Sequence, residues 1–169
     1  TIPKSLLIQH REGIIVGSAC GMGELYGAVM KGASEKELKK IASFYDYLEI
    51  QPICNNGFLV DNGVVKDVTV LQDYNRTILE LGRKLDKPVI AASDVHFLDP
   101  EDEQYRKILQ AAKKFSDAAR GCPIYFRTTD EMLAEFEYLG KDVAREVVIT
   151  NTRAIADQID EIELLPKDL

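Results

Sequence analysis

The sequence lacks long apolar runs and any segment that would carry it into or across a membrane. Apolar stretches such as Pro88–Ala92 are far shorter than the roughly 20 residues that a transmembrane helix needs, and no basic segment followed by an apolar one opens the chain. The sequence therefore predicts neither a membrane span nor a signal peptide. Because the chain begins at Thr1 and not at a methionine, we expect it to be cut from a longer polypeptide.

Positive charge is also in short supply. The chain has 21 Lys and Arg residues against 28 Asp and Glu residues, which gives a net charge of −7. Residues 1–128 carry 17 of each sign, so the whole excess lies in residues 129–169, with 11 acidic and 4 basic residues. Because clustered Lys and Arg bind the nucleic-acid backbone, we expect any DNA to be bound by the parent protein rather than by this chain. The acidic part is either a solvated face or a surface that meets a basic neighbour.

Cysteine is scarce, and the common catalytic motifs are missing. The three cysteines Cys20, Cys54 and Cys122 form no C-x-x-C pair, which excludes a zinc ribbon and a redox pair. An odd, sparse set is typical of a reducing compartment and predicts a cytoplasmic protein. The sequence has no G-x-S-x-G, no glycine-rich phosphate loop and no H-E-x-x-H. With 46% hydrophobic and 29% charged residues, it is typical of a globular protein with a core.

Short apolar segments alternate with amphipathic helical patterns. We expect buried strands at residues 14–16, 47–51 and 88–92 and an extended piece at 124–126. Helices are expected at about 23–31, 34–45, 70–85, 128–140, 142–150 and 153–159 and shortly after Pro100, with capping boxes at Ser34–Glu37 and Thr128–Glu131. Continuous apolar strands joined by helical crossovers predict an α/β fold with a parallel sheet and helices outside.

Two further patterns concern the organisation of the chain. The sequence Asp61-Asn62-Gly63 lies between apolar residues in the least regular stretch, residues 53–69, and predicts a β-hairpin there. Near Thr128 the pattern changes from α/β to all-helical, at the point where the acidic excess begins. We therefore expect a boundary between residues 1–127 and a helical tail, residues 128–169.

Asp94 and His96 directly follow the expected strand at 88–92. Residues i and i+2 of an extended chain point to the same side, so a carboxylate and an imidazole face one point, and these donors suit Zn, Mn or Fe. Cys20 follows the strand at 14–16 in a turn of small residues, and the same rim of the sheet would carry it. The alternative is that Asp94 caps the next helix, His96 is a loop residue and Cys20 packs as a small hydrophobe.

Four other residues have side chains that could take part in chemistry, and structural or surface roles are considered for each of them. Glu49, in the strand at 47–51, either faces the same rim or is a structural hydrogen-bond partner. Cys54 and Cys122 are interpreted as packing or surface residues, and His10 lies in a polar stretch and is expected to be exposed. The sequence assigns no catalytic residue.

Four segments in order along the chain resemble one family. They are GSAC (17–20), YDYLEIQP (45–52), KPVIAASDVHFLDP (87–100) and FRTTDEML (126–133). Together they resemble the C-terminal part of the PHP (polymerase and histidinol phosphatase) domain of bacterial DNA polymerase III α subunits. The resemblance is closest to the PolC type, in which an exonuclease domain is inserted within the PHP domain.

The resemblance implies a fold and a metal site. The fold would be the C-terminal part of a distorted (βα)₇ barrel over residues 1–127, with the helical tail 128–169 leading toward the polymerase palm. Divalent metals, Zn or Mn, would bind at the carboxyl ends of the strands, with Asp94, His96 and Cys20 among the ligands. The family's other ligands lie in the N-terminal half of the barrel and have no match here, so this chain would supply three ligands at most.

Two functions follow from the resemblance. One is a structural module of a replicative DNA polymerase, inactive by itself, in which any metal stabilises the fold. The other is a metal-dependent phosphoesterase or pyrophosphatase, in which bound metals activate water. The implied partners are the remaining PHP half and the exonuclease and polymerase domains of the same polypeptide. Because half of a closed sheet exposes a strand edge, we also expect self-association of the isolated chain.

Overall fold

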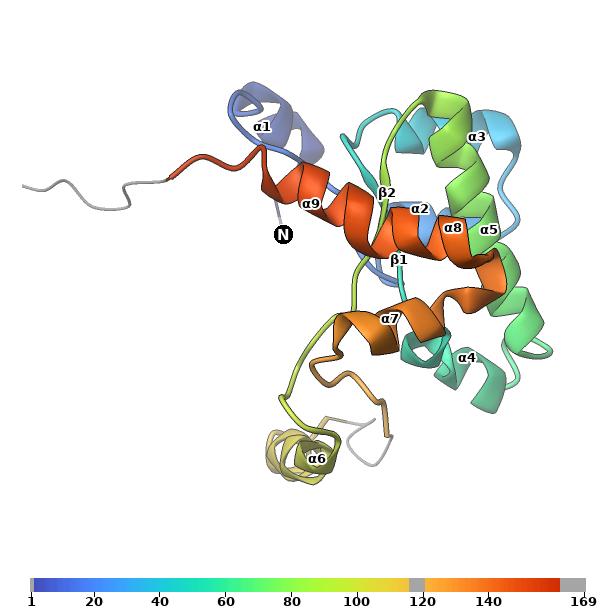
Figure 1. Cartoon of the computed structure of the whole chain (residues 1–169), viewed down its shortest axis with the longest axis vertical. Coiled ribbons are helices and arrows are strands. Elements are labelled where there is room, and N and C mark those ends of the chain that lie inside the picture. Colours follow the sequence, from blue (N-terminus) through green and yellow to red (C-terminus); the bar gives the residue numbers. More distant parts are fainter. Residues whose placement is uncertain (1, 116–120, 162–169) are drawn as a thin grey trace, which may run out of the picture.

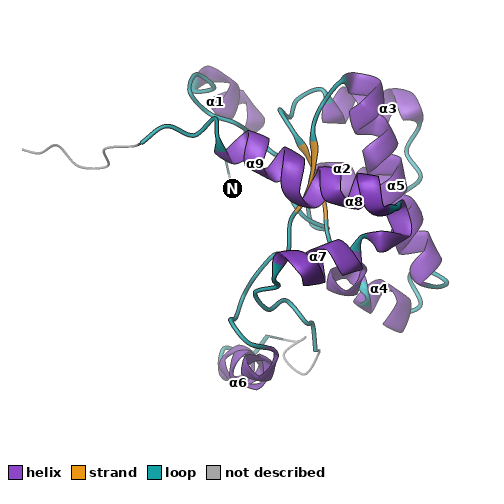
Figure 2. Cartoon of the chain, viewed as in Figure 1, coloured by secondary structure: helices purple, strands orange, loops and turns teal. Residues whose placement is uncertain are grey.

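Helices surround a small parallel sheet in the part of the chain that the computed structural model describes, residues 2–115 and 121–161 (Figure 1). The α-helices are α1 (Lys4–Gln9), α2 (Glu24–Met30), α3 (Glu35–Ala42), α4 (Phe58–Asp61), α5 (Val68–Leu85), α6 (Glu103–Ala112), α7 (Thr129–Glu135), α8 (Lys141–Arg145) and α9 (Asn151–Ala156). Shorter helical segments are the 3₁₀ turns η1 (Ile53–Asn56), η2 (Pro100–Asp102) and η3 (Glu137–Leu139) and the π-helical η4 (Glu146–Thr150). The strands are β1 (Leu48–Ile50) and β2 (Val89–Ala91), drawn in orange in Figure 2.

The two strands pair in parallel and form the centre of the fold. Leu48 lies opposite Val89, and Ile50 lies opposite Ala91. All four side chains are buried, as expected for the continuous apolar strands of a parallel sheet. The predictions of strands in these two segments are confirmed.

Two isolated bridges extend the pairing beyond the strands. Gly17 pairs in parallel with Tyr47, and Phe97 pairs in parallel with Tyr125. A β-carbon at Gly17 would lie only 2.3 Å from the Tyr47 ring, so the close approach requires glycine. The prediction of a buried strand at 14–16 is wrong: these residues belong to no strand, Ile14 is 45% exposed, and the pairing is limited to the bridge at the next residue, Gly17.

Helix α5 is the crossover that joins β1 to β2. Its N-cap is Asp67, whose carboxylate accepts a hydrogen bond from the Thr69 N–H at 2.9 Å, one of the preferred N-cap arrangements. A β-carbon at Gly82 would lie 2.4 Å from Cγ2 of Val89, so glycine lets the last turns of α5 lie close to β2. The helix predicted at 70–85 is confirmed and begins two residues earlier.

The helices after residue 128 pack onto the same core as the strands. Met132, Phe136, Ala144 and Val147 are buried in one cluster with residues of α2, α3, α5, β1 and β2. The side chain of Asn151 also donates a hydrogen bond to the Val89 carbonyl at 2.9 Å. The helical tail and the sheet thus share one hydrophobic core.

Within the tail, the local predictions hold with two changes. The helix expected at 128–140 is divided into α7, which ends at Glu135, and the 3₁₀ turn η3. Thr128 and Glu131 form the predicted capping box of α7. The two stretches expected at 142–150 and 153–159 join into one continuous helical run through α8, η4 and α9. Residues 162–169 of the expected tail lie outside the described residues.

The hairpin predicted around Asn62-Gly63 is wrong, because the segment is helical. Gly63 has a φ of +66° and ends α4, and its N–H donates to the Val60 carbonyl at 2.9 Å. An Asn-Gly pair suits this left-handed helix end as well as it suits a hairpin turn. Tertiary packing favours the helix end over the hairpin turn, because Leu59 is buried against Val65 and Leu71 in a small second core.

The shared core gives a stability test with a matched control. Phe136 is fully buried, whereas Phe126 is 62% exposed. We expect Phe136→Ala to lower the free energy of unfolding of the whole chain by about 3–5 kcal/mol and Phe126→Ala to change it by less than about 0.5 kcal/mol, as measured by urea denaturation. A loss confined to a separate transition of the tail would contradict the shared core.

Candidate functional site

The candidate site lies where the parallel segments end. Because parallel strands point the same way, the residues that follow them gather at one edge of the sheet. We call this edge the carboxyl rim and define it as Ser18–Cys20, Gln51–Asn56, Ser93–His96 and Arg127. This definition follows the chain and includes the three predicted ligands, Cys20, Asp94 and His96.

Ser18 and Glu49 connect the first rim segment to β1. The Ser18 hydroxyl is buried and accepts a hydrogen bond from the Glu49 N–H at 2.9 Å. Burial raises the pKa of the Glu49 carboxyl, and the negative charge of Asp94 raises it further. Glu49 is thus within electrostatic reach of Asp94, as the first of its two interpretations expected.

Asp94 and His96 lie in an exposed loop after β2. Asp94 has a φ of +57°, an uncommon left-handed conformation for a residue other than glycine. The backbone carbonyl of Asp94 lies 2.7 Å from Nδ1 of His96. The other ring nitrogen, Nε2, takes no part in this hydrogen bond. The next helical segment begins at Asp99, whose N–H donates to the Asp102 carboxylate at 3.2 Å. Helix capping is therefore carried out by Asp99 and not by Asp94.

Arg127 is the most buried charged residue of the rim, and sequence reasoning did not single it out. Its side chain is 2% exposed and donates to the Ser93 hydroxyl at 3.3 Å and to Sγ of Cys54 at 3.1 Å. Its Nε lies 3.4 Å from a carboxylate oxygen of Glu135 in α7, and the guanidinium stacks 4.7 Å from the ring centroid of Tyr125. Arg127 therefore ties the end of β2, η1 and α7 together.

Cys54 and Cys122 also lie at or beside the rim, and both are half-buried. Sγ of Cys122 is 4.0 Å from the backbone carbonyl oxygens of Cys54 and Asn55. Burial and the nearby Glu135 carboxylate raise the pKa of the Cys54 thiol to about 11, although Arg127 lowers it. Burial likewise raises the pKa of Cys122. Both thiols are protonated at neutral pH and behave as packing groups, in line with the sequence interpretation.

The predicted ligands do not form a complete metal site on their own. In residues 2–115 and 121–161, no group of three or more His, Cys, Asp or Glu side chains is arranged to hold a metal ion. Cys20, Asp94 and His96 offer sulfur, oxygen and nitrogen donors that suit zinc, but they share a rim and not a closed coordination sphere. The described residues therefore supply no complete ligand set by themselves.

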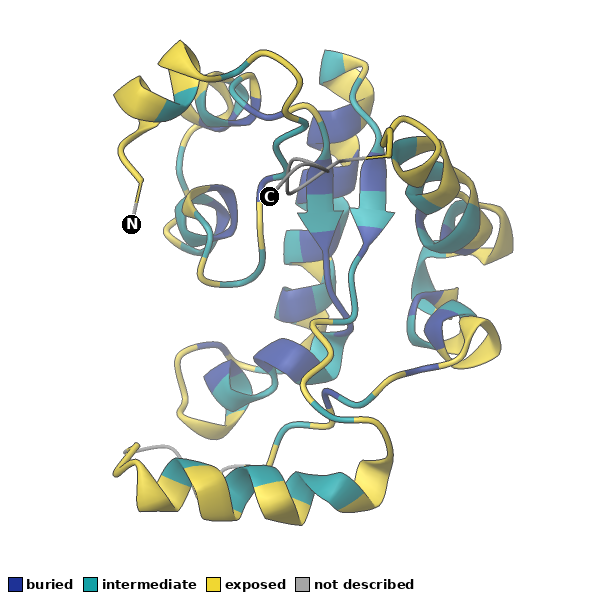
Figure 3. Ribbon diagram, turned by 90° about the vertical axis from the view of Figure 1, so that its left-hand side faces the viewer, coloured by how far each residue is buried: buried dark blue, intermediate teal, exposed yellow. Residues whose placement is uncertain are grey.

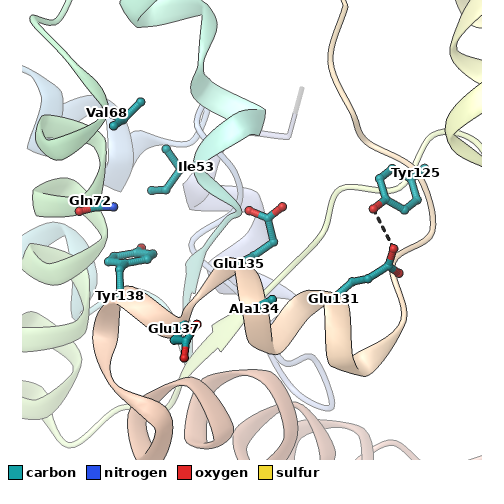
Figure 4. Close-up of a pocket in the computed structure, with 9 residues that line it drawn as sticks. All are labelled: Ile53, Val68, Gln72, Tyr125, Glu131, Ala134, Glu135, Glu137 and Tyr138. Atoms are coloured by element: carbon teal, nitrogen blue, oxygen red, sulfur yellow. Dashed lines mark hydrogen bonds between the residues drawn. The ribbon is translucent and has the colours of Figure 1, made fainter.

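An open cavity of about 830 Å³ lies beside α7 and borders the rim at Ile53 (Figure 4). Its described lining residues are Ile53, Val68, Gln72, Tyr125, Glu131, Ala134, Glu135, Glu137 and Tyr138. The Tyr125 hydroxyl donates to Glu131 at 2.9 Å, and the lining contains none of the three predicted ligands. Three carboxylates in one hollow repel an anion, so this cavity does not suit a phosphate ester.

In the part of the chain that the structure describes, no helix is both long enough and apolar enough to cross a bilayer.

Comparison with known proteins identifies one group of relatives. The chain is 54% identical to DNA polymerase III PolC-type of Clostridium perfringens over 99% of its length. It is 55% identical to the protein of the same name from Caldanaerobacter subterraneus over 98% of its length, and 42% identical to that of Bacillus subtilis over 99%. In each case the chain spans only 12% of the relative. No family model matches the chain. The chain thus corresponds in sequence to a segment of these polymerases, which confirms the resemblance to the PolC type.

The electrostatics of the rim give a test at Cys54. Because the Glu135 carboxylate raises the pKa of this thiol, we expect Glu135→Gln to lower that pKa and to speed alkylation of Cys54 by iodoacetamide at pH 9 by about two- to tenfold. The rate is measured at each cysteine by mass spectrometry. Glu137→Gln, at an exposed carboxylate of η3, is the control and should leave the rate unchanged. An equal rate in both variants would contradict the assigned cause.

Proposed function

We propose that the chain is the C-terminal part of the PHP domain of a PolC-type DNA polymerase III α subunit, and that it supports DNA synthesis by the longer polypeptide. The proposal is carried by the identity of 54–55% to two proteins of that name, over nearly the whole chain. Because the chain spans only 12% of those proteins, its contribution is that of one part of a large enzyme. The isolated chain is expected to have no polymerase activity.

The proposed fold is half of a distorted (βα)₇ barrel, and the two faces of the sheet support it. Leu48 and Ile50 are buried on the face that packs against α5. Glu49 and its partner Ile90 point to the opposite face and are only half-buried. Figure 3 views the sheet with α5 behind it. A sheet with one well-covered face and one half-buried face fits a barrel wall whose interior is completed by the remaining half.

The proposed metal site uses Asp94, His96 and Cys20 as three ligands of Zn or Mn, with the remaining ligands supplied by the other half of the PHP domain. Two observations support a shared site. The three residues follow parallel segments at one rim, and contact of Nδ1 of His96 with the Asp94 carbonyl fixes the ring so that Nε2 is the nitrogen left for a ligand bond. When bound, such a metal supplies folding energy that depends on ligands from both halves.

A structural role is preferred to phosphoester hydrolysis. The Arg127 guanidinium, the buried cation at the rim, is engaged by Ser93, Cys54 and Glu135. The hollow beside α7 is lined by carboxylates. Neither feature favours an anionic substrate in this half of the domain.

The proposed partners and cellular location follow from the assignment of the chain to a PolC-type polymerase. The partners are the remaining PHP half and the exonuclease and polymerase domains of one polypeptide, in the cytoplasm, and DNA is bound by the parent protein. The outer segments of the sheet, at Gly17 and Tyr125, are the edges that the other half would pair. In its absence, self-association of the isolated chain is expected through one of these edges.

The structural role is tested by His96→Ala in the complete polymerase. Losing one ligand should weaken metal binding roughly 10- to 100-fold and lower the melting temperature in the presence of metal, with primer extension at permissive temperature unchanged. Metal analysis, calorimetry and a primer-extension assay measure the three quantities.

His10→Ala is the matched control, because His10 is the other histidine of the chain and is exposed. Loss of primer extension with metal content and melting temperature intact would contradict the structural role. Metal-dependent hydrolysis of pyrophosphate or a phosphate monoester that disappears in His96→Ala would instead support the phosphoesterase alternative.

A further inference from the structure

Helix α6 presents its apolar side to solvent. None of its ten residues, all of them described, is buried. Tyr105, Ile108 and Leu109 are 59%, 64% and 64% exposed, and their spacing of three and four residues places them on one face of the helix. We call these three residues the α6 face.

The opposite side of α6 is polar and faces the protein. Glu103 accepts a hydrogen bond from the Cys122 N–H at 2.6 Å and pairs with Lys107 at 3.4 Å. Arg106 donates to Gln110 at 3.1 Å. These side chains are half-buried, whereas the apolar ones are not. This is the reverse of a surface helix of a globular protein, whose apolar stripe faces the core.

The position of α6 in the fold also leaves its apolar side uncovered. Figure 1 and Figure 3 show the helix set apart from the other helices, at one end of the molecule. Leu98 and Phe126, on the two segments that connect α6 to the body, are 63% and 62% exposed and are linked by a backbone hydrogen bond of 3.2 Å. A helix of ten residues is marginal in water without tertiary packing of its apolar side. The α6 face therefore has the properties of one half of an interface.

We infer that the α6 face docks against another domain of the same longer polypeptide, on an apolar patch edged with carboxylates. This inference rests on the proposed function, in which the chain is one part of a large polymerase. The relatives are such proteins, since the chain spans 12% of each. The carboxylates are expected opposite Lys113 and Lys114, two exposed cations at the carboxyl end of α6.

A second copy of the chain is the less favoured occupant because of the area involved. Three side chains offer a few hundred Å², whereas a stable interface between separate proteins buries about 800 Å² on each partner. Two domains of one polypeptide have an effective concentration in the millimolar range, so a smaller patch is enough to hold them together.

The test is cleavage by a lysine-specific protease after Lys113 and Lys114. We expect the initial rate to be at least about tenfold lower in the complete polymerase than in the isolated chain, since docking limits the local opening that cleavage requires. Ile108→Glu and Leu109→Glu should each return the rate in the complete polymerase to that of the isolated chain. Val64→Glu is the control, because Val64 is 59% exposed and lies far along the chain from α6.

The other outcomes overturn the inference in distinct ways. Equal cleavage rates in the isolated chain and the complete polymerase would mean that no domain covers the α6 face. Protection of the isolated chain that grows with concentration and is lost in Ile108→Glu, together with a dimer in sedimentation equilibrium, would assign the face to a second copy. Neither result depends on metal binding or primer extension, so failure here is distinguishable from failure of the proposed function.

Discussion

Parallel pairing of β1 with β2 is the constraint on which the rest of the structure depends. Two parallel neighbours need a crossover, and α5 provides it by packing on one face of the sheet, close enough to require Gly82. The same pairing makes both strands end at one edge. Chain segments far apart in sequence therefore lie close together beyond the strands, as shown by the hydrogen bond from the Asn55 side chain to the Ser93 carbonyl and by the close approach of Asn56 to Gly21.

Arg127 makes the rim and the helical tail depend on each other. A buried charge is tolerated only when it is paired and hydrogen-bonded, and the partners of this guanidinium come from the segment after β2, from η1 and from α7. Met132 and Phe136 of the following segment fill the core beneath the sheet. The tail is thus held both by a buried ion pair and by apolar packing, although its composition differs sharply from that of residues 1–128.

Local signals in the sequence predict local structure, and tertiary packing decides the rest. The two strands β1 and β2, the N-cap at Ser34 and the capping box at Thr128 are predictable because each depends on a few neighbouring residues. Asn62-Gly63 fits either a hairpin or a helix end, and only the packing of Leu59 selects the helix. At the site, the pattern of Asp94 and His96 indicates the rim but not Arg127, whose burial depends on partners up to 73 residues away.

Three features of the chain have one physical explanation. The sheet has one half-buried face with Glu49 on it, the three predicted ligands form no metal site within the described residues, and α6 turns its apolar side outward. The hydrophobic pattern of α6 determines which of its side chains lie on one face of the helix. Burial of that face depends on whether another part of the protein packs against it. We propose that each feature is half of an interaction whose other half lies elsewhere in a longer polypeptide. A domain divided between distant parts of a polypeptide would have this form, because its core, its proposed ligands and its helix contacts would be shared between those parts.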